Sequence, residues 1–133
     1  MTKLMHSQTL QVRIENSPQT VYEYAVNPEN FPEWTTSFSL SARQSGGEWL
    51  VETPDGPMGI AFAARNEWGV LDHHVRPASG PELYNPMRVI PNGEGCEVHF
   101  TLFQHSGMSD GKFAEDAGMV QRDLETLKRR MEK

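Results

Sequence analysis

The C-terminal segment, residues 109–133, contains no proline, although the chain holds 9 prolines in 133 residues. Its apolar residues recur at steps of three and four, which is the spacing of one helix face. Ser109 is a suitable N-cap, and basic residues in the last turns suit the negative end of the helix dipole. We predict one long amphipathic helix whose apolar stripe must pack on another element. The stripe consists of Phe113, Ala117, Val120, Leu124, Leu127 and Met131.

Upstream of this helix, prolines and glycines divide the chain into short runs. Residues 9–15 alternate between apolar and polar, as in a strand with one buried face. Ser17 and Pro18 then predict a helix start, as cap and first residue, and residues 28–34 predict a second helical turn. Further strand-like runs, with a turn expected at Gly46-Gly47, are typical of an antiparallel meander. These runs are residues 35–43, 48–53, 58–65, 69–76, 83–90 and 96–104.

The composition fits one small domain and limits the classes of partner that the protein is expected to bind. The net charge of −6 disfavours a nucleic-acid partner and docking on an anionic membrane. No stretch reaches the roughly 18 apolar residues of a membrane helix, and the N-terminus lacks the apolar core of a signal peptide. The single cysteine, Cys96, excludes an internal disulfide and fits a reducing cytoplasm. We expect a single cytoplasmic domain over residues 1–133, with no metal, no cofactor and no membrane insertion.

The opening of the chain resembles a known superfamily. Residues 12–34, V-R-I-E-N-S-P-Q-T-V-Y-E-Y-A-V-N-P-E-N-F-P-E-W, combine a strand, a Ser-Pro helix start, an Asn-Pro turn and a tryptophan. They look like the start of the START-like (SRPBCC) superfamily, which includes birch-pollen-allergen-like proteins, polyketide cyclases/dehydrases and Aha1-type domains. The D-H-H-V, P-M-R-V and T-L-F stretches at residues 72–75, 86–89 and 101–103 are similar to an uncharacterised bacterial branch.

The resemblance implies an α+β helix-grip fold, in which a curved antiparallel sheet surrounds the long C-terminal helix. It also implies a cavity between the sheet and the helix. Members of the superfamily bind lipids, sterols, polyketides or other apolar molecules in such a cavity; some are enzymes, and many only bind. The fold alone does not decide between these activities.

Strand register predicts which residues face that cavity, because a one-residue slip exchanges the two faces of a sheet. We select the register that gathers apolar residues on one face. The opposite choice would bury Arg88, Glu97 and His99, and unpaired buried charge is costly. In the selected register Asp72 lies on the outer face, and we interpret it as part of a solvated charge ladder. The predicted pairs are Val89–Cys96, Met87–Val98, Asn85–Phe100, Leu83–Leu102, Val75–Leu83, His73–Asn85 and Leu71–Met87.

Two polar residues, His73 and Asn85, remain among the inward-facing residues, and Pro86 directly after them predicts a bulge. A histidine there can act as acid, base or hydrogen-bond donor near neutral pH. Alternatively, the two side chains satisfy each other or a buried water. We predict a site with His73 and Asn85 as its catalytic or orienting groups. The expected ligand-binding residues are Phe62, Leu71, His73, Asn85, Met87, Phe100, Met58 and Val120.

Three functions remain open at this point. The first is binding of a small apolar or amphipathic molecule in the cavity between sheet and helix. The second is a polyketide cyclase/dehydrase-type enzyme, in which His73 moves a proton and Asn85 stabilises an enolate-like oxygen. The third is a protein–protein adaptor of the Aha1 type, using the outer sheet face or the loop at residues 108–111. An edge strand at residues 35–43 also leaves pairing with a second copy, as a homodimer, open.

Overall fold

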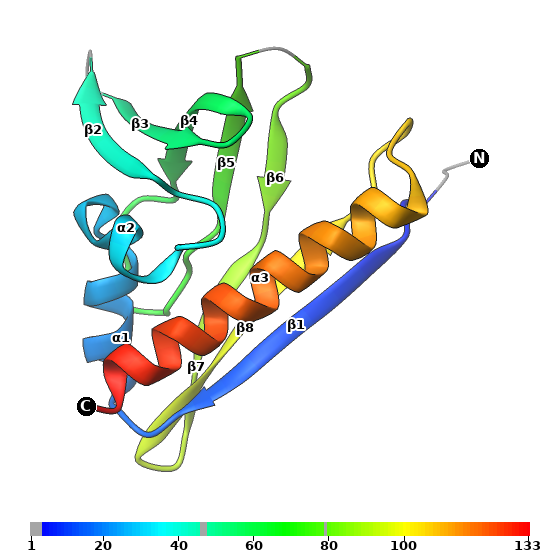
Figure 1. Cartoon of the computed structure of the whole chain (residues 1–133). Helices are drawn as coiled ribbons and strands as arrows, with labels where there is room; N and C mark the ends of the chain where they lie inside the picture. The colour runs from blue at the N-terminus through cyan, green and yellow to red at the C-terminus, as the bar shows by residue number, and fades with distance from the viewer. Residues whose placement is uncertain (1–3, 46–47, 79) are drawn as a thin grey trace.

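The computed structural model describes residues 4–45, 48–78 and 80–133. It shows antiparallel strands that curve around one long helix (Figure 1). The expected turn at Gly46-Gly47 lies outside the described residues. The elements are β1 (Ser7–Ile14), α1 (Pro18–Ala25), the 3-10 helix η1 (Pro28–Asn30), α2 (Phe31–Trp34), β2 (Ser41–Ser45), β3 (Glu48–Thr53), β4 (Gly56–Phe62), β5 (His73–Pro77), β6 (Leu83–Asn85), β7 (Met87–Asn92), β8 (Gly95–Phe103) and α3 (Asp110–Met131).

Both predicted helix starts are confirmed. The Ser17 hydroxyl accepts a hydrogen bond from the Thr20 N–H at 3.2 Å, and Pro18 is the first helical residue. The Ser109 hydroxyl accepts from the Lys112 N–H at 3.1 Å. Each cap satisfies one of the N–H groups that the first helical turn leaves without a partner. In the described residues no helix has the length and apolar character needed to cross a membrane.

The strand expected at residues 35–43 is wrong over its first part. Residues 36–38 form a turn, and β2 begins only at Ser41. The Thr35 hydroxyl donates to the Phe31 carbonyl at 2.8 Å, which extends the end of α2 into the turn. The Ser37 N–H donates to Asp123 of α3 at 2.9 Å, so the turn is anchored on the helix. The part of residues 35–43 that forms an edge strand, and could pair with a second copy, is therefore limited to the start of β2.

The single strand expected at residues 83–90 is also wrong, because the chain changes sheets at Pro86. β6 ends the sheet ordered β2-β3-β4-β5-β6, and β7 ends the sheet ordered β1-β8-β7. A proline has no N–H to continue a ladder. Residues 69–71 bridge the two sheets: the Leu71 N–H donates to the Met87 carbonyl, and the Val89 N–H donates to the Gly69 carbonyl, each at 2.8 Å. The strand expected at residues 69–76 is accordingly shortened to β5.

The predicted register is correct between β5 and β6 and shifted by two residues between β7 and β8. His73 pairs with Asn85 as predicted. The last hairpin instead pairs Met87 with Phe100, so the predicted Asn85–Phe100 pair is wrong. The turn is only two residues long, with Gly93 at φ +58°, the sign that the first position of a type II′ turn takes. A shift of two keeps every side chain on its predicted face.

The interior of the fold has two parts that differ in burial. The first, the buried cluster, joins β1, β7, β8 and the C-terminal half of α3, and its members are at most 2% exposed: Ile14, Val89, Val98, Leu124 and Leu127. The second, the half-buried cluster, is packed against this core from β4, β6, β8 and the middle of α3, and its members are only partly buried: Phe62, Leu83, Phe100, Leu102 and Val120.

Candidate functional site

His73 lies within the half-buried cluster. It is the first residue of β5 and is 9% exposed. Its imidazole lies between two phenyl rings, with centroid separations of 5.1 Å to Phe62 and 5.7 Å to Phe100. Nδ1 lies 3.0 Å from the Leu71 carbonyl oxygen. Desolvation by burial lowers the pKa of His73 below its usual value, so the ring is neutral at neutral pH.

Asn85 lies opposite His73 on the neighbouring strand, as predicted from the sequence. It is partly exposed, and among the described residues its side-chain amide has no hydrogen-bond partner. No hydrogen bond joins it to His73 within this part of the chain. The interpretation that the two side chains satisfy each other directly is therefore wrong, and both retain free hydrogen-bonding capacity.

The other predicted ligand-binding residues fall into three groups. Phe62 and Phe100 contact the His73 ring, and Val120 is half-buried on α3. Met58 shares the inner face of β4 but pairs with Pro77, about 13 Å along the strand from Phe62. Leu71 and Met87 are 0% and 2% exposed and offer almost no surface to a ligand. Leu83 and Leu102, which the register analysis also turned inward, complete the half-buried cluster.

Asp72, next to His73, makes hydrogen bonds to residues on both sides of the break between β6 and β7 at Pro86. Its carboxylate accepts hydrogen bonds from the Met87 N–H at 2.9 Å, the Tyr84 hydroxyl at 3.0 Å and the Arg88 guanidinium at 2.9 and 3.0 Å. The Arg88 hydrogen bond chiefly lowers the pKa of Asp72, to about 2. Only 15% of the side chain is exposed, so its interpretation as part of a solvated charge ladder is wrong. The available signal in the sequence was Pro86, because a break in the strand there leaves the Met87 N–H to be satisfied by a side chain.

A second polar group is buried where α2 meets α3. Asp123 is 6% exposed, and its main partner is the Ser37 N–H. Burial raises the pKa of Asp123 to about 6. Trp34 is also 6% exposed, and its indole N–H has no partner in the described residues. The burial of Asp123 did not follow from the apolar periodicity of α3, because that pattern ignores the polar residues beside the stripe.

Comparison with known proteins places this geometry in a fold family. Searches found no matching protein-family model and no matching curated protein. Among solved structures, the protein XoxI from Bacillus cereus superposes with a TM-score of 0.78 at 18% identity, over 96% of each chain. A START superfamily protein from Mycobacterium smegmatis gives 0.73 at 10% identity, over 95% of this chain and 97% of its own. Ara h 8.0201 gives 0.72 at 10% identity, over 96% and 97%.

This chain has the START-like helix-grip fold. The predicted α+β architecture, a curved antiparallel sheet with a long C-terminal helix, is confirmed. At these identities the likeness concerns the fold and leaves the ligand open.

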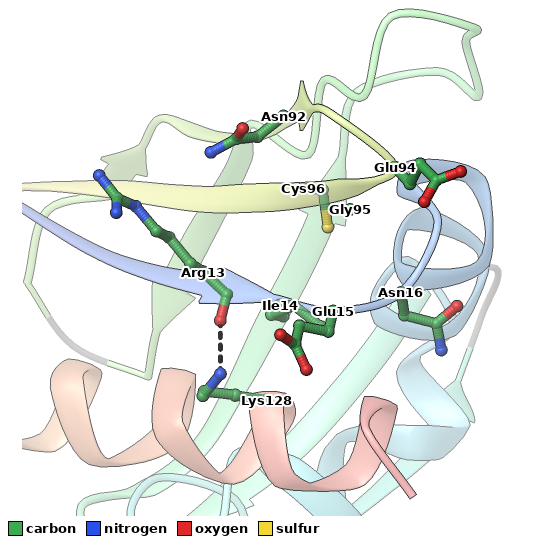
Figure 2. A pocket seen from close by; sticks show the side chains of 9 residues that line it. All are labelled: Arg13, Ile14, Glu15, Asn16, Asn92, Glu94, Gly95, Cys96 and Lys128. Atoms are coloured by element: carbon green, nitrogen blue, oxygen red, sulfur yellow. Dashed lines mark hydrogen bonds between the residues drawn. The ribbon is translucent and has the colours of Figure 1, made fainter.

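A START-like fold suggests the space between sheet and helix as a binding site, but the two hollows described below are not lined by His73 or Asn85. A cleft of about 590 Å³ opens where β1 and β8 pass the end of α3 (Figure 2). Its donors are already engaged: the Lys128 ammonium donates to the Arg13 carbonyl at 2.8 Å, and the Asn16 amide donates to the Met131 carbonyl at 2.6 Å. The cleft is lined by Arg13, Ile14, Glu15, Asn16, Asn92, Glu94, Gly95, Cys96 and Lys128.

A second hollow of about 330 Å³ lies at the ends of β3 and β4, and its walls include Val26, Trp49 and Phe62. Phe62 is the one predicted ligand-binding residue that lines either of the two hollows. Cys96 lies in the wall of the first cleft, where burial raises the pKa of its thiol. Across residues 4–45, 48–78 and 80–133, no three His, Cys, Asp or Glu side chains are grouped to hold a metal ion.

Proposed function

We propose that the half-buried cluster around His73 binds a small apolar or amphipathic molecule between the sheet and α3. The observation that carries this proposal is the incomplete burial of apolar side chains that face inward. Phe62, Phe100 and Val120 all retain exposed surface, although the fold turns them toward the interior. Ligand sites in proteins combine such apolar walls with a few polar groups, and here the polar groups are His73 and Asn85.

The energetics favour an occupant at this place. Each square ångström of apolar surface that a ligand covers contributes about 25 cal/mol. The buried cluster offers no such gain, since Leu124 and Leu127 are 1% and 0% exposed. The half-buried cluster does, and the fold supports the same location, because its START superfamily neighbour has the same arrangement of sheet and helix.

The proposal is tested with the apolar fluorescent probe N-phenyl-1-naphthylamine and two tryptophan variants. Val120→Trp adds a large ring at one position of the half-buried cluster, whereas Glu125→Trp places the same ring on the exposed side of α3. We expect wild type and Glu125→Trp to enhance the probe fluorescence alike, and Val120→Trp to lose most of this enhancement. Near-ultraviolet circular dichroism checks that both variants are folded. Unchanged binding by a folded Val120→Trp would contradict the proposal, and so would a wild type that does not bind.

A second candidate, proton transfer of the cyclase/dehydrase kind, is favoured by one observation. His73 is neutral, and its Nε2 has no partner among the described residues, so it can accept a proton. Wild type should then accelerate exchange of the acidic C–H of a 1,3-diketone with heavy water, followed by NMR. His73→Gln should lose the acceleration. Equal exchange rates would remove the candidate. The adaptor role and the homodimer stay predictions.

A further inference from the structure

The tautomer of His73 follows from its backbone contact. A carbonyl oxygen accepts hydrogen bonds and cannot donate them, so the 3.0 Å contact with Leu71 requires the proton on Nδ1. Burial favours the neutral ring, as the lowered pKa of His73 indicates. A neutral imidazole protonated at Nδ1 presents Nε2 as an acceptor only. Nε2 lies on the side of the ring away from the Leu71 carbonyl, because the two nitrogens of an imidazole point in different directions.

The groups around this nitrogen leave it without a donor. Phe62 from β4 and Phe100 from β8 flank the ring, and both are apolar. Asp72 and His74, the titratable neighbours on the same strand segment, bond and stack with groups on the outer face. Among the described residues, no side chain or N–H donates to Nε2. Among the described residues only the indole nitrogen of Trp34 is both fully enclosed and without a partner, so Nε2 of His73 keeps some accessible surface. A ligand donor can therefore reach Nε2 and form a hydrogen bond there.

Asn85 adds a complementary group. Its side chain is about 5 Å from that of His73 at the level of the Cβ atoms, as expected for directly opposed residues. Its free amide can donate a hydrogen bond. A hydroxyl group donates one hydrogen bond and accepts others, so it satisfies both side chains. A ketone, ester or ether lacks the donor, a carboxylate brings an acceptor to an acceptor, and an ammonium group is costly to bury.

We infer that the ligand of this site is an apolar alcohol or phenol, whose hydroxyl donates to Nε2 of His73 and accepts from the Asn85 amide. This inference rests on the proposed ligand-binding function. It specifies a ligand that is apolar except for one hydroxyl group. His73 acts as the hydrogen-bond acceptor for that group.

The test compares ligands that share one apolar body. Displacement of N-phenyl-1-naphthylamine gives the affinities of naphthalene, 2-naphthol, 2-methoxynaphthalene and 2-naphthoate. We expect 2-naphthol to bind roughly tenfold tighter than 2-methoxynaphthalene, the effect of one net hydrogen bond. Failure of every compound to bind would overturn the proposed function. Binding of naphthalene with no advantage for 2-naphthol would overturn this inference alone.

Two matched variants locate the effect. His73→Phe keeps an aromatic ring of similar size but removes the acceptor, so 2-naphthol and 2-methoxynaphthalene should bind equally. His74→Phe makes the same change on the neighbouring residue, whose ring stacks on Tyr84 at 5.1 Å on the outer face. It should keep the roughly tenfold preference. A preference that survives in His73→Phe, or disappears in His74→Phe, would contradict the assignment.

Nitrogen NMR of the imidazole tests the tautomer without depending on the fold of a variant. Two-bond proton–nitrogen correlation spectra of the wild type should show His73 with its proton on Nδ1. Addition of 2-naphthol should move the Nε2 resonance and leave Nδ1 nearly unchanged. A proton on Nε2 in the free protein would overturn the inference, even if 2-naphthol binds.

Discussion

Residues at different positions along the apolar stripe of α3 are packed very differently. Along the C-terminal half, Leu124 and Leu127 are sealed against the strands, at 1% and 0% exposed. Farther toward the N-terminus, Phe113 is buried beside His6, but Val120 remains half-buried. The comparison separates two tasks, since the buried cluster supplies packing energy and the half-buried cluster retains surface that a ligand can cover. The following changes test this division, from the largest expected effect to the smallest.

Truncating a leucine in each cluster gives the largest contrast. Leu127→Ala should lower the free energy of unfolding by about 2–5 kcal/mol, because it leaves a cavity in a sealed region. Leu102→Ala makes the same chemical change at a half-buried position and should cost less than half as much. Urea unfolding followed by circular dichroism measures both. Equal losses would show that the two clusters do not differ in packing.

Asp123, buried on α3 against the turn after α2, should reduce stability at neutral pH. Its folded pKa of about 6 exceeds the unfolded value of about 3.9, so stability is lost as pH rises from about 4 to 6. Asp123→Asn keeps an acceptor for the Ser37 N–H and removes the charge. The variant should exceed wild type by about 2 kcal/mol at pH 7 and match it near pH 4. A pH-independent difference in urea unfolding would refute this explanation.

Asp72 lies directly behind the half-buried cluster and should stabilise the protein in the opposite pH range. Its pKa of about 2 is below the unfolded value, so its contribution is present above pH 4 and is lost as pH falls toward 2. Asp72→Asn should cost about 1–2 kcal/mol at pH 7 and nothing near pH 2. Asp55→Asn, the same change in the exposed β3–β4 turn, is the control in pH-dependent urea unfolding. Equal effects of the two variants would argue against a stabilising role of the hydrogen bonds that Asp72 accepts from Tyr84, Met87 and Arg88.

Lys128 should matter least. It joins α3 to the Arg13 carbonyl and to Glu132 at the rim of the 590 Å³ cleft, where it is 39% exposed. Lys128→Met keeps the apolar stem, so the loss should stay below about 0.5 kcal/mol. Thermal unfolding is a sufficient measurement. A larger loss would mean that the mixed-charge cleft holds the C-terminal end of α3 in place, and the buried cluster would then not be its main anchor.

Local signals in the sequence predicted much of the fold. Ser17, Pro18 and Ser109 act through neighbouring residues, and the stripe of α3 repeats over many turns, so neither depends on distant contacts. The His73–Asn85 pair followed from alternation on two strands. The predicted register of the last hairpin was wrong by two residues. The alternation of apolar and polar residues repeats every two residues, so registers that differ by two bury the same side chains. Only the two-residue turn at Gly93 selects the observed register among them.

The errors in the predicted strands arose where the structure depends on contacts between residues that are far apart in the sequence. The turn after α2 depends on Asp123, far along the chain, and the break at Pro86 depends on Asp72 and Arg88. The candidate site shows the same limit. Inward orientation was predictable for Leu71 and Phe100 alike, but Leu71 is sealed and Phe100 is not. Whether an inward face is covered depends on where α3 crosses the sheet, and no pattern of residue types specifies that.

The incomplete burial of the half-buried cluster also affects how such a chain can diverge. A substitution at Phe62, Leu83 or Leu102 removes contacts that were never complete, so it uses little of the margin of about 5–15 kcal/mol that separates folded from unfolded domains. Changes of side-chain volume in the buried cluster have no such freedom. Mutations can therefore accumulate around His73 while the scaffold persists, which allows one architecture to acquire new selectivity without first acquiring new stability.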